Sequence, residues 1–62
     1  MTEFGINIRI ALLKLGKTRK WLVEQVKEKT DLFFDDAYLW RIEHGQRKPE
    51  KIVTAIKEIL EI

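Results

Sequence analysis

Apolar residues recur at helical spacing in four segments of the chain, and breaks separate these segments at three places. The breaks are Gly16, the stretch 30–35, and the residues from Gly45 to Pro49. The opening residues also alternate in strand style, but the length of the first apolar run favours a helix. The pattern therefore predicts an all-α chain with helices over residues 4–15, 19–29, 36–44 and 50–60.

Residues that begin and end helices stand at the expected boundaries. Thr18 and Asp35 precede the second and third predicted helices, where a side-chain oxygen can accept a hydrogen bond from a free backbone N–H group. Gly16 and Gly45 follow the first and third helices, as glycines commonly do. Pro49 suits the first position of the fourth helix, where its missing N–H costs nothing.

Each predicted helix presents one apolar face, and the four faces together predict the core. The inward residues are Phe4, Ile8, Ala11, Leu12 and Leu15, then Trp21, Leu22, Val23 and Val26, then Tyr38, Leu39 and Ile42, and finally Ile52, Val53, Ile56, Ile59 and Leu60.

A second apolar stripe runs along the first predicted helix. It consists of Ile6, Ile10 and Leu13, and it implies burial on two sides of that helix. We expect residues 32–34 and the fourth helix to cover it, rather than a second subunit. Leu32, Phe33 and Phe34 are themselves apolar and are expected to be buried.

The size of the chain and its missing residue types exclude several classes of function. With 62 residues the chain forms a single domain, 1–62, with one small core. It has one histidine, no cysteine and no serine, which excludes a disulfide frame, a thiolate zinc site and a Ser or Cys triad. We expect neither enzymatic activity nor a metal or cofactor. No segment resembles a membrane span or a signal peptide, so the sequence predicts a cytoplasmic protein.

Basic residues gather in two places, although the net charge is only +2. One cluster comprises Lys14, Lys17, Arg19 and Lys20, and the other comprises Arg47, Lys48 and Lys51. The segment 24–36 between them is rich in acids. Such segregation suggests one basic face for a polyanion, and ordinary solvated charge is the alternative.

Two stretches resemble the Cro and lambda-repressor-like helix-turn-helix family. Residues 16–23, Gly-Lys-Thr-Arg-Lys-Trp-Leu-Val, are similar to the opening of its helix-turn-helix. Residues 38–49 resemble its recognition helix and the basic turn that follows, and Arg-Ile-Glu-His-Gly-Gln-Arg-Lys-Pro is the most specific part. The resemblance covers about residues 4–60. It implies a compact four-helix helix-turn-helix domain of the kind found in small phage or prophage Cro-type regulators.

The sequence departs from the family pattern in three respects. About six extra residues lie between Val26 and Phe34, which implies a longer second helix, a real loop, or both. Leu12 stands where many members have an arginine that pairs with the glutamate matching Glu43. Glu43, which we expect to anchor structure, must therefore find another partner or stay exposed. Trp21 replaces a usual outward acid and is expected to be half-buried near Phe33.

The resemblance implies that the third helix enters the major groove of DNA, whose width of ≈12 Å admits a helix. The expected base contacts are Asp36 to a cytosine amino group, Ala37 to a thymine methyl, Arg41 to guanine, and Trp40 on the DNA side rather than over the inserted loop. The expected phosphate contacts come from Lys17, Thr18, Arg19, Lys20, His44, Gln46, Arg47 and Lys48.

The sequence thus predicts a sequence-specific double-stranded DNA-binding regulator, a Cro-type repressor. A homodimer on a two-fold operator is expected, with contacts through the fourth helix, its tail or the Arg47 turn, whereas the free protein can be a monomer. The alternative is a protein-interaction module without DNA binding, such as an antirepressor or antitoxin-like partner. The acidic stretch from Asp31 to Asp36 and the exposed position expected for Trp40 favour this alternative.

Overall fold

A computed structural model describes all residues from 1 to 62 and contains four α-helices and no strand. The helices are α1 (Glu3–Leu15), α2 (Arg19–Thr30), α3 (Asp36–Glu43) and α4 (Glu50–Leu60). The predicted all-α class is confirmed, and each helix end lies within one residue of its predicted place. None of the four helices has both the length and the apolar character needed to cross a membrane.

The predicted helix boundaries follow from local capping. The Thr18 hydroxyl accepts a hydrogen bond from the backbone N–H of Trp21, and the Asp35 carboxylate accepts one from the N–H of Tyr38. Gly16 ends α1 in the left-handed conformation with φ of 68°, which glycine adopts without strain. Pro49 differs slightly from expectation: it precedes the first helical residue, because its ψ of 116° is extended.

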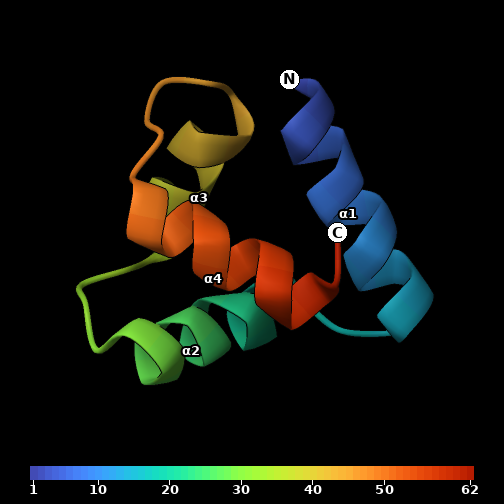
Figure 1. Cartoon of the computed structure of the whole chain (residues 1–62). Coiled ribbons are helices and arrows are strands. Elements are labelled where there is room, and N and C mark those ends of the chain that lie inside the picture. The colour runs from blue at the N-terminus through green and yellow to red at the C-terminus, as the bar shows by residue number, and fades with distance from the viewer.

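The helices pack as two pairs around one core. α4 lies mainly on α2, and α1 lies mainly on α3, with its amino-terminal end beside the end of α3 (Figure 1). All four helices contribute fully buried residues, among them Ile8, Leu22, Leu39 and Ile56. Phe34, from the connection between α2 and α3, completes this core.

Several predicted core positions are exposed instead. Leu15 is about half-exposed because it is the last residue of α1, where the helix ends at Gly16. Of the three apolar residues in the connection, only Phe34 is buried, whereas Leu32 and Phe33 are 42% and 75% exposed. Such a short connection packs only one of its apolar side chains, that of Phe34, against the core, and the neighbouring side chains point away from the core.

The expected cover for the stripe of Ile6, Ile10 and Leu13 is also wrong. These side chains lie on the side of α1 opposite its buried residues, Ile8 and Leu12, and they remain exposed, Leu13 at 82%. The last residues of α4 border a hollow beside Ile10, but they leave this side chain 45% exposed. The structure therefore leaves an uncovered apolar stripe along the outer face of this helix.

Candidate functional site

The outer face of α3 carries the four residues predicted to contact bases. Asp36, Ala37, Trp40 and Arg41 are all exposed. Leu39 on the same helix is fully buried. Residues three and four apart are neighbours on a helix, so the pairs 36/40, 37/40 and 37/41 join these four side chains into one continuous surface. The structure confirms that they lie together and face solvent.

Trp40 lies against the end of its own helix. Its ring stacks on the imidazole of His44, with centroids 3.8 Å apart and planes 20° apart, and the side chain stays 44% exposed. The ring atom Nδ1 of His44 lies 2.8 Å from the backbone carbonyl oxygen of Trp40. The pair therefore forms a flat, held aromatic surface at the exposed side of α3.

The extra residues between α2 and α3 form both a longer helix and a loop. α2 continues to Thr30, whose hydroxyl donates to the carbonyl of Val26 at 2.7 Å. Asp31 then adopts the left-handed conformation with φ of 57°. The connection runs from Asp31 to Asp35, and buried Phe34 fixes it against Tyr38 with ring centroids 5.3 Å apart.

Glu43 is the centre of an ion-pair cluster that joins three helices. Its side chain is fully buried, and one carboxylate oxygen, Oε1, accepts a hydrogen bond from Nη1 of Arg19 on α2. The other oxygen, Oε2, lies 3.5 Å from Nε of Arg9 on α1. Nε of Arg19 also donates to Oδ1 of Asp36 at 3.0 Å. We call Arg9, Arg19, Asp36 and Glu43 the Glu43 cluster.

The backbone of Glu43 adds a second link to α1. Its carbonyl oxygen accepts hydrogen bonds from the backbone N–H of Thr2 at 3.0 Å and from the Thr2 hydroxyl at 2.8 Å. A Cβ atom at Gly5 would lie closer to this carbonyl oxygen than van der Waals contact allows. Gly5 therefore permits the close approach between α1 and the end of α3. The expectation that Glu43 anchors structure is confirmed.

The pKa of Arg19 reflects its position in this cluster. Partial burial lowers the pKa of the guanidinium, but the hydrogen bond and negative charge of Glu43, followed by those of Asp36, raise it by more. The net shift is upward, so the charge on Arg19 is held in place by two carboxylates. Arg19 and Asp36, both predicted to contact DNA, are thus paired with one another.

Arg41 stands in contrast to Arg19, because no carboxylate lies within ion-pair distance of its guanidinium.

Sequence reasoning missed the roles of Arg9 and Arg19 in the Glu43 cluster. Their partner lies 34 and 24 residues away in the sequence, so no local pattern joins them. Sequence reasoning also missed Phe33 as an exposed residue.

Basic side chains lie on both sides of the outer face of α3. On the side of Asp36, Lys17 and Lys20 are exposed around the start of α2, where Lys17 lies 5.5 Å from the ring centre of Trp21. Trp21 is partly buried against the core, as expected, whereas the predicted neighbour Phe33 is exposed and lines a hollow with Ala37 and Arg41.

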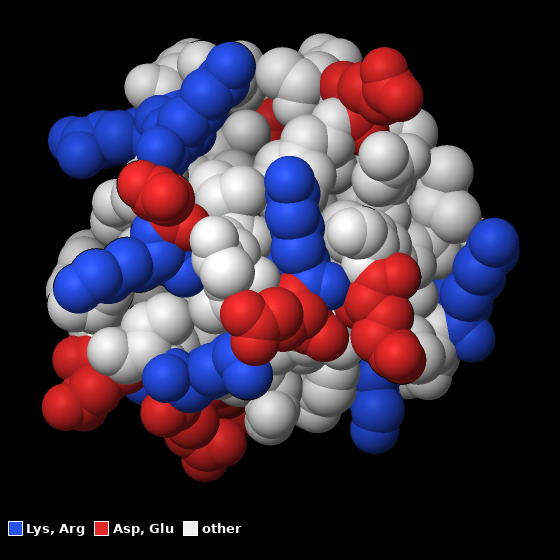
Figure 2. All heavy atoms as spheres, viewed as in Figure 1, with Lys and Arg blue, Asp and Glu red and all other residues white.

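On the other side, Arg47 lies over the Tyr38 ring at 5.7 Å from its centre, and Gln46 and Lys48 are exposed. In Figure 2, Lys and Arg side chains project at the upper left, where Figure 1 places the turn after α3. Over the α4 side of the same view, positive and negative side chains are interspersed. Two further residues belong to the predicted phosphate set. Thr18 caps the start of α2, and His44 lies partly buried at the end of α3.

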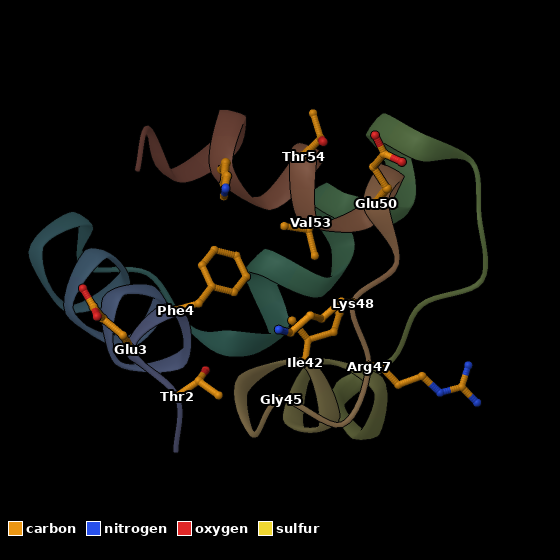
Figure 3. Close-up of a pocket in the computed structure, with 11 residues that line it drawn as sticks. Thr2, Glu3, Phe4, Ile42, Gly45, Arg47, Lys48, Glu50, Val53 and Thr54 are labelled. Atoms are coloured by element: carbon orange, nitrogen blue, oxygen red, sulfur yellow. The ribbon is translucent and has the colours of Figure 1, made fainter.

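Two hollows border this region. The first has a volume of about 350 Å³ and lies between the connection, α3 and the turn after it; its lining residues are Phe33, Asp35, Ala37, Tyr38, Arg41 and Arg47. The second, of about 530 Å³, lies between α1 and α4, and Phe4 and Val53 point into it (Figure 3). Its rim carries side chains of both charges, including Glu3, Glu50 and Lys48, so it has no consistent electrostatic character.

No group of three or more His, Cys, Asp or Glu side chains is placed to hold a metal ion. Comparisons of this chain with protein-family models, with curated proteins and with solved structures found no match.

Proposed function

We propose that this chain is a sequence-specific, double-stranded DNA-binding regulator of the Cro type, built as a lambda-repressor-like helix-turn-helix domain. In this proposal α2 and α3 form the helix-turn-helix, with the connection Asp31–Asp35 as an extended turn. α3 lies in the major groove, and the protein acts by occupying its site, without enzymatic activity or a cofactor.

One observation carries the proposal. Arg41 is exposed on α3 without an acidic partner, and basic segments lie on both sides of the helix. A guanidinium free of carboxylates can donate two hydrogen bonds to O6 and N7 of guanine. Ala37 and Trp40 on the same face offer apolar contacts to a thymine methyl or a sugar. This is the arrangement that base reading in the major groove requires.

The flanking segments supply the phosphate contacts in this proposal. At the start of α2, Lys17, Lys20 and the free backbone N–H groups after the Thr18 cap attract an anion. On the other side, His44, Gln46, Arg47 and Lys48 reach the second strand. Arg19 contributes differently from the sequence-based expectation: its guanidinium is held by Glu43 and Asp36, so it positions α2 against α3.

The same face would suit a protein partner, and this is the second candidate function. Exposed Phe33 and Trp40 form the apolar part of that surface, and Asp31, Asp35 and Asp36 provide a negative edge that DNA does not favour. An antirepressor or antitoxin-like module would use this surface without binding DNA. Replacing Arg41 separates the two, because only the DNA-binding protein loses site preference.

A homodimer on a two-fold site remains part of the proposal. One short α3 offers few base contacts, so two copies with half-sites about one helical turn apart are expected to bind more tightly. The uncovered stripe of Ile6, Ile10 and Leu13 offers an apolar surface for such association, alongside the predicted contacts through α4 or the Arg47 turn.

Binding of a fluorescently labelled duplex pool of random sequence tests the proposal. If the protein makes about six to ten phosphate contacts as a dimer, its affinity is expected to fall by ~10³–10⁵ between about 50 and 200 mM salt. Lys48→Gln is expected to reduce the slope of this dependence by about one contact. Lys27→Gln is the matched control. It removes the same charge from an exposed lysine about two turns after the start of α2, and it is expected to leave the slope unchanged. Absence of binding at low salt by the folded protein contradicts the proposal.

A further inference from the structure

We infer that Phe33, in the connection between α2 and α3, makes an apolar contact with a thymine methyl group at the edge of the DNA site. This inference rests on the proposed function, because it adds a specificity-determining residue to the same surface. Nothing in the sequence pattern marked Phe33 for this role, since the expected place for residues 32–34 was the interior.

The first argument is the exposure of Phe33. Its neighbour Phe34 enters the core, whereas 75% of the surface of Phe33 faces solvent. The connection is held on both sides of Phe33. Before it, the N–H of Leu32 donates to the Thr30 hydroxyl at 3.2 Å, and after it, Phe34 packs against Tyr38. A large aromatic side chain is thus displayed on a fixed backbone next to the first turn of α3.

The second argument concerns the residues that surround Phe33. It lines the hollow of about 350 Å³ together with Ala37 and Arg41, two of the predicted base contacts, and with Arg47, a predicted phosphate contact. The surface around Phe33 is therefore continuous with the proposed DNA interface. Arg41 and Arg47 make its electrostatic character suitable for a phosphate backbone, although Asp35 opposes them at one edge.

The third argument concerns which group of DNA this side chain can meet. Phe33 lies beside the helix that is proposed to enter the major groove. The methyl group of thymine is the apolar group that the major groove presents, and phenylalanine is among the side chains that contact it. The uncovered stripe on α1 has apolar residues too, but it has no comparable position next to Ala37 and Arg41.

Replacing thymine with uracil tests this contact, because uracil lacks only the methyl group. Duplexes are first selected from a random pool with the wild-type protein, and each thymine of the selected duplex is then replaced in turn. We expect one replacement to weaken wild-type binding about fourfold, the value of one buried methyl-sized group. Phe33→Ala is expected to weaken binding to the thymine duplex by a similar factor and to be insensitive to that replacement.

Two further variants make the result specific. Phe33→Leu keeps an apolar side chain and is expected to retain part of the sensitivity to the methyl group. Leu15→Ala removes an exposed apolar residue at the end of α1, outside both the proposed DNA surface and the stripe of Ile6, Ile10 and Leu13, and is expected to leave both binding and thymine sensitivity unchanged. Because residues 33 and 15 are exposed, Phe33→Ala, Phe33→Leu and Leu15→Ala should unfold at urea concentrations similar to that of the wild-type protein.

The outcomes separate the inference from the proposed function. If a duplex is selected but wild type and Phe33→Ala are equally sensitive to thymine replacement, the role of Phe33 is overturned. The methyl contact then belongs to another residue such as Ala37, and the proposal of DNA binding stands. Unchanged DNA binding by Phe33→Ala also overturns it and leaves the aromatic surface to a protein partner. Failure to select any duplex overturns the proposed function itself.

Discussion

Arg19 and Arg41 border the same face of the molecule, but their guanidiniums are in opposite electrostatic situations. Arg19 is partly buried and bonded to two carboxylates, those of Glu43 and Asp36. Arg41 is exposed and has no carboxylate partner. One arginine therefore stabilises the arrangement of α2 and α3, and the other is available to a ligand. A basic residue in a basic segment is not by itself a contact residue, since its nearest acids decide its role.

The largest predicted effect comes from replacing Arg19. Arg19→Gln leaves the fully buried carboxylate of Glu43 with only Arg9 at 3.5 Å, so we expect the free energy of unfolding to fall by about 3 kcal/mol. Arg41→Gln is the matched variant, and its unfolding free energy is expected to stay within about 0.5 kcal/mol of the wild-type value. Urea unfolding followed by circular dichroism measures both.

Binding reverses the order of the two variants. Arg41→Gln is expected to weaken binding to a selected duplex by about tenfold or more and to relax its preference at one guanine. Arg19→Gln, at temperatures where it is folded, is expected to keep that preference. Similar losses of stability in both variants, or loss of guanine preference in Arg19→Gln alone, would contradict the distinction between these arginines.

A smaller effect is expected when the carboxylate is removed instead. Glu43→Gln leaves two guanidiniums that still reach solvent, because the Arg9 and Arg19 side chains are 51% and 29% exposed. We expect a loss of about 2 kcal/mol, less than for Arg19→Gln, because no buried charge stays unpaired. Glu58→Gln, which breaks the exposed pair with Lys29, is the control and should cost less than about 1 kcal/mol. Equal losses would show that burial of Glu43 has no energetic consequence.

The helices could be predicted from the sequence because local chemistry determines their ends. Thr18 and Asp35 cap the helices that follow them, and Gly16 ends α1, each through contacts within four residues. The burial of Leu39 and the exposure of Arg41 follow from helical spacing in the same way. These properties depend on one helix at a time.

The properties that could not be predicted depend on where the helices lie relative to one another. The stripe of Ile6, Ile10 and Leu13 has the same spacing as a buried face, and only the packing of α1 shows that it stays exposed. The partners of Glu43, Arg9 and Arg19, come from other helices, and no local pattern in the sequence joins them to Glu43. By contrast, the stacking of Trp40 on His44 joins residues four apart and could have been found from their spacing.

The most direct test of the account is an NMR titration that observes the Nε–Hε signals of the arginines while a random-sequence duplex is added, at about 50 and 200 mM salt. We predict that the signals of Arg41 and Arg47 shift at low salt and return at high salt, together with backbone signals of residues 36–41 and 44–48. The Arg19 signal should hardly move, because its Nε–H already donates to Asp36 at 3.0 Å. A large shift at Arg19 without one at Arg41, or no shift at any of these residues, would contradict the account.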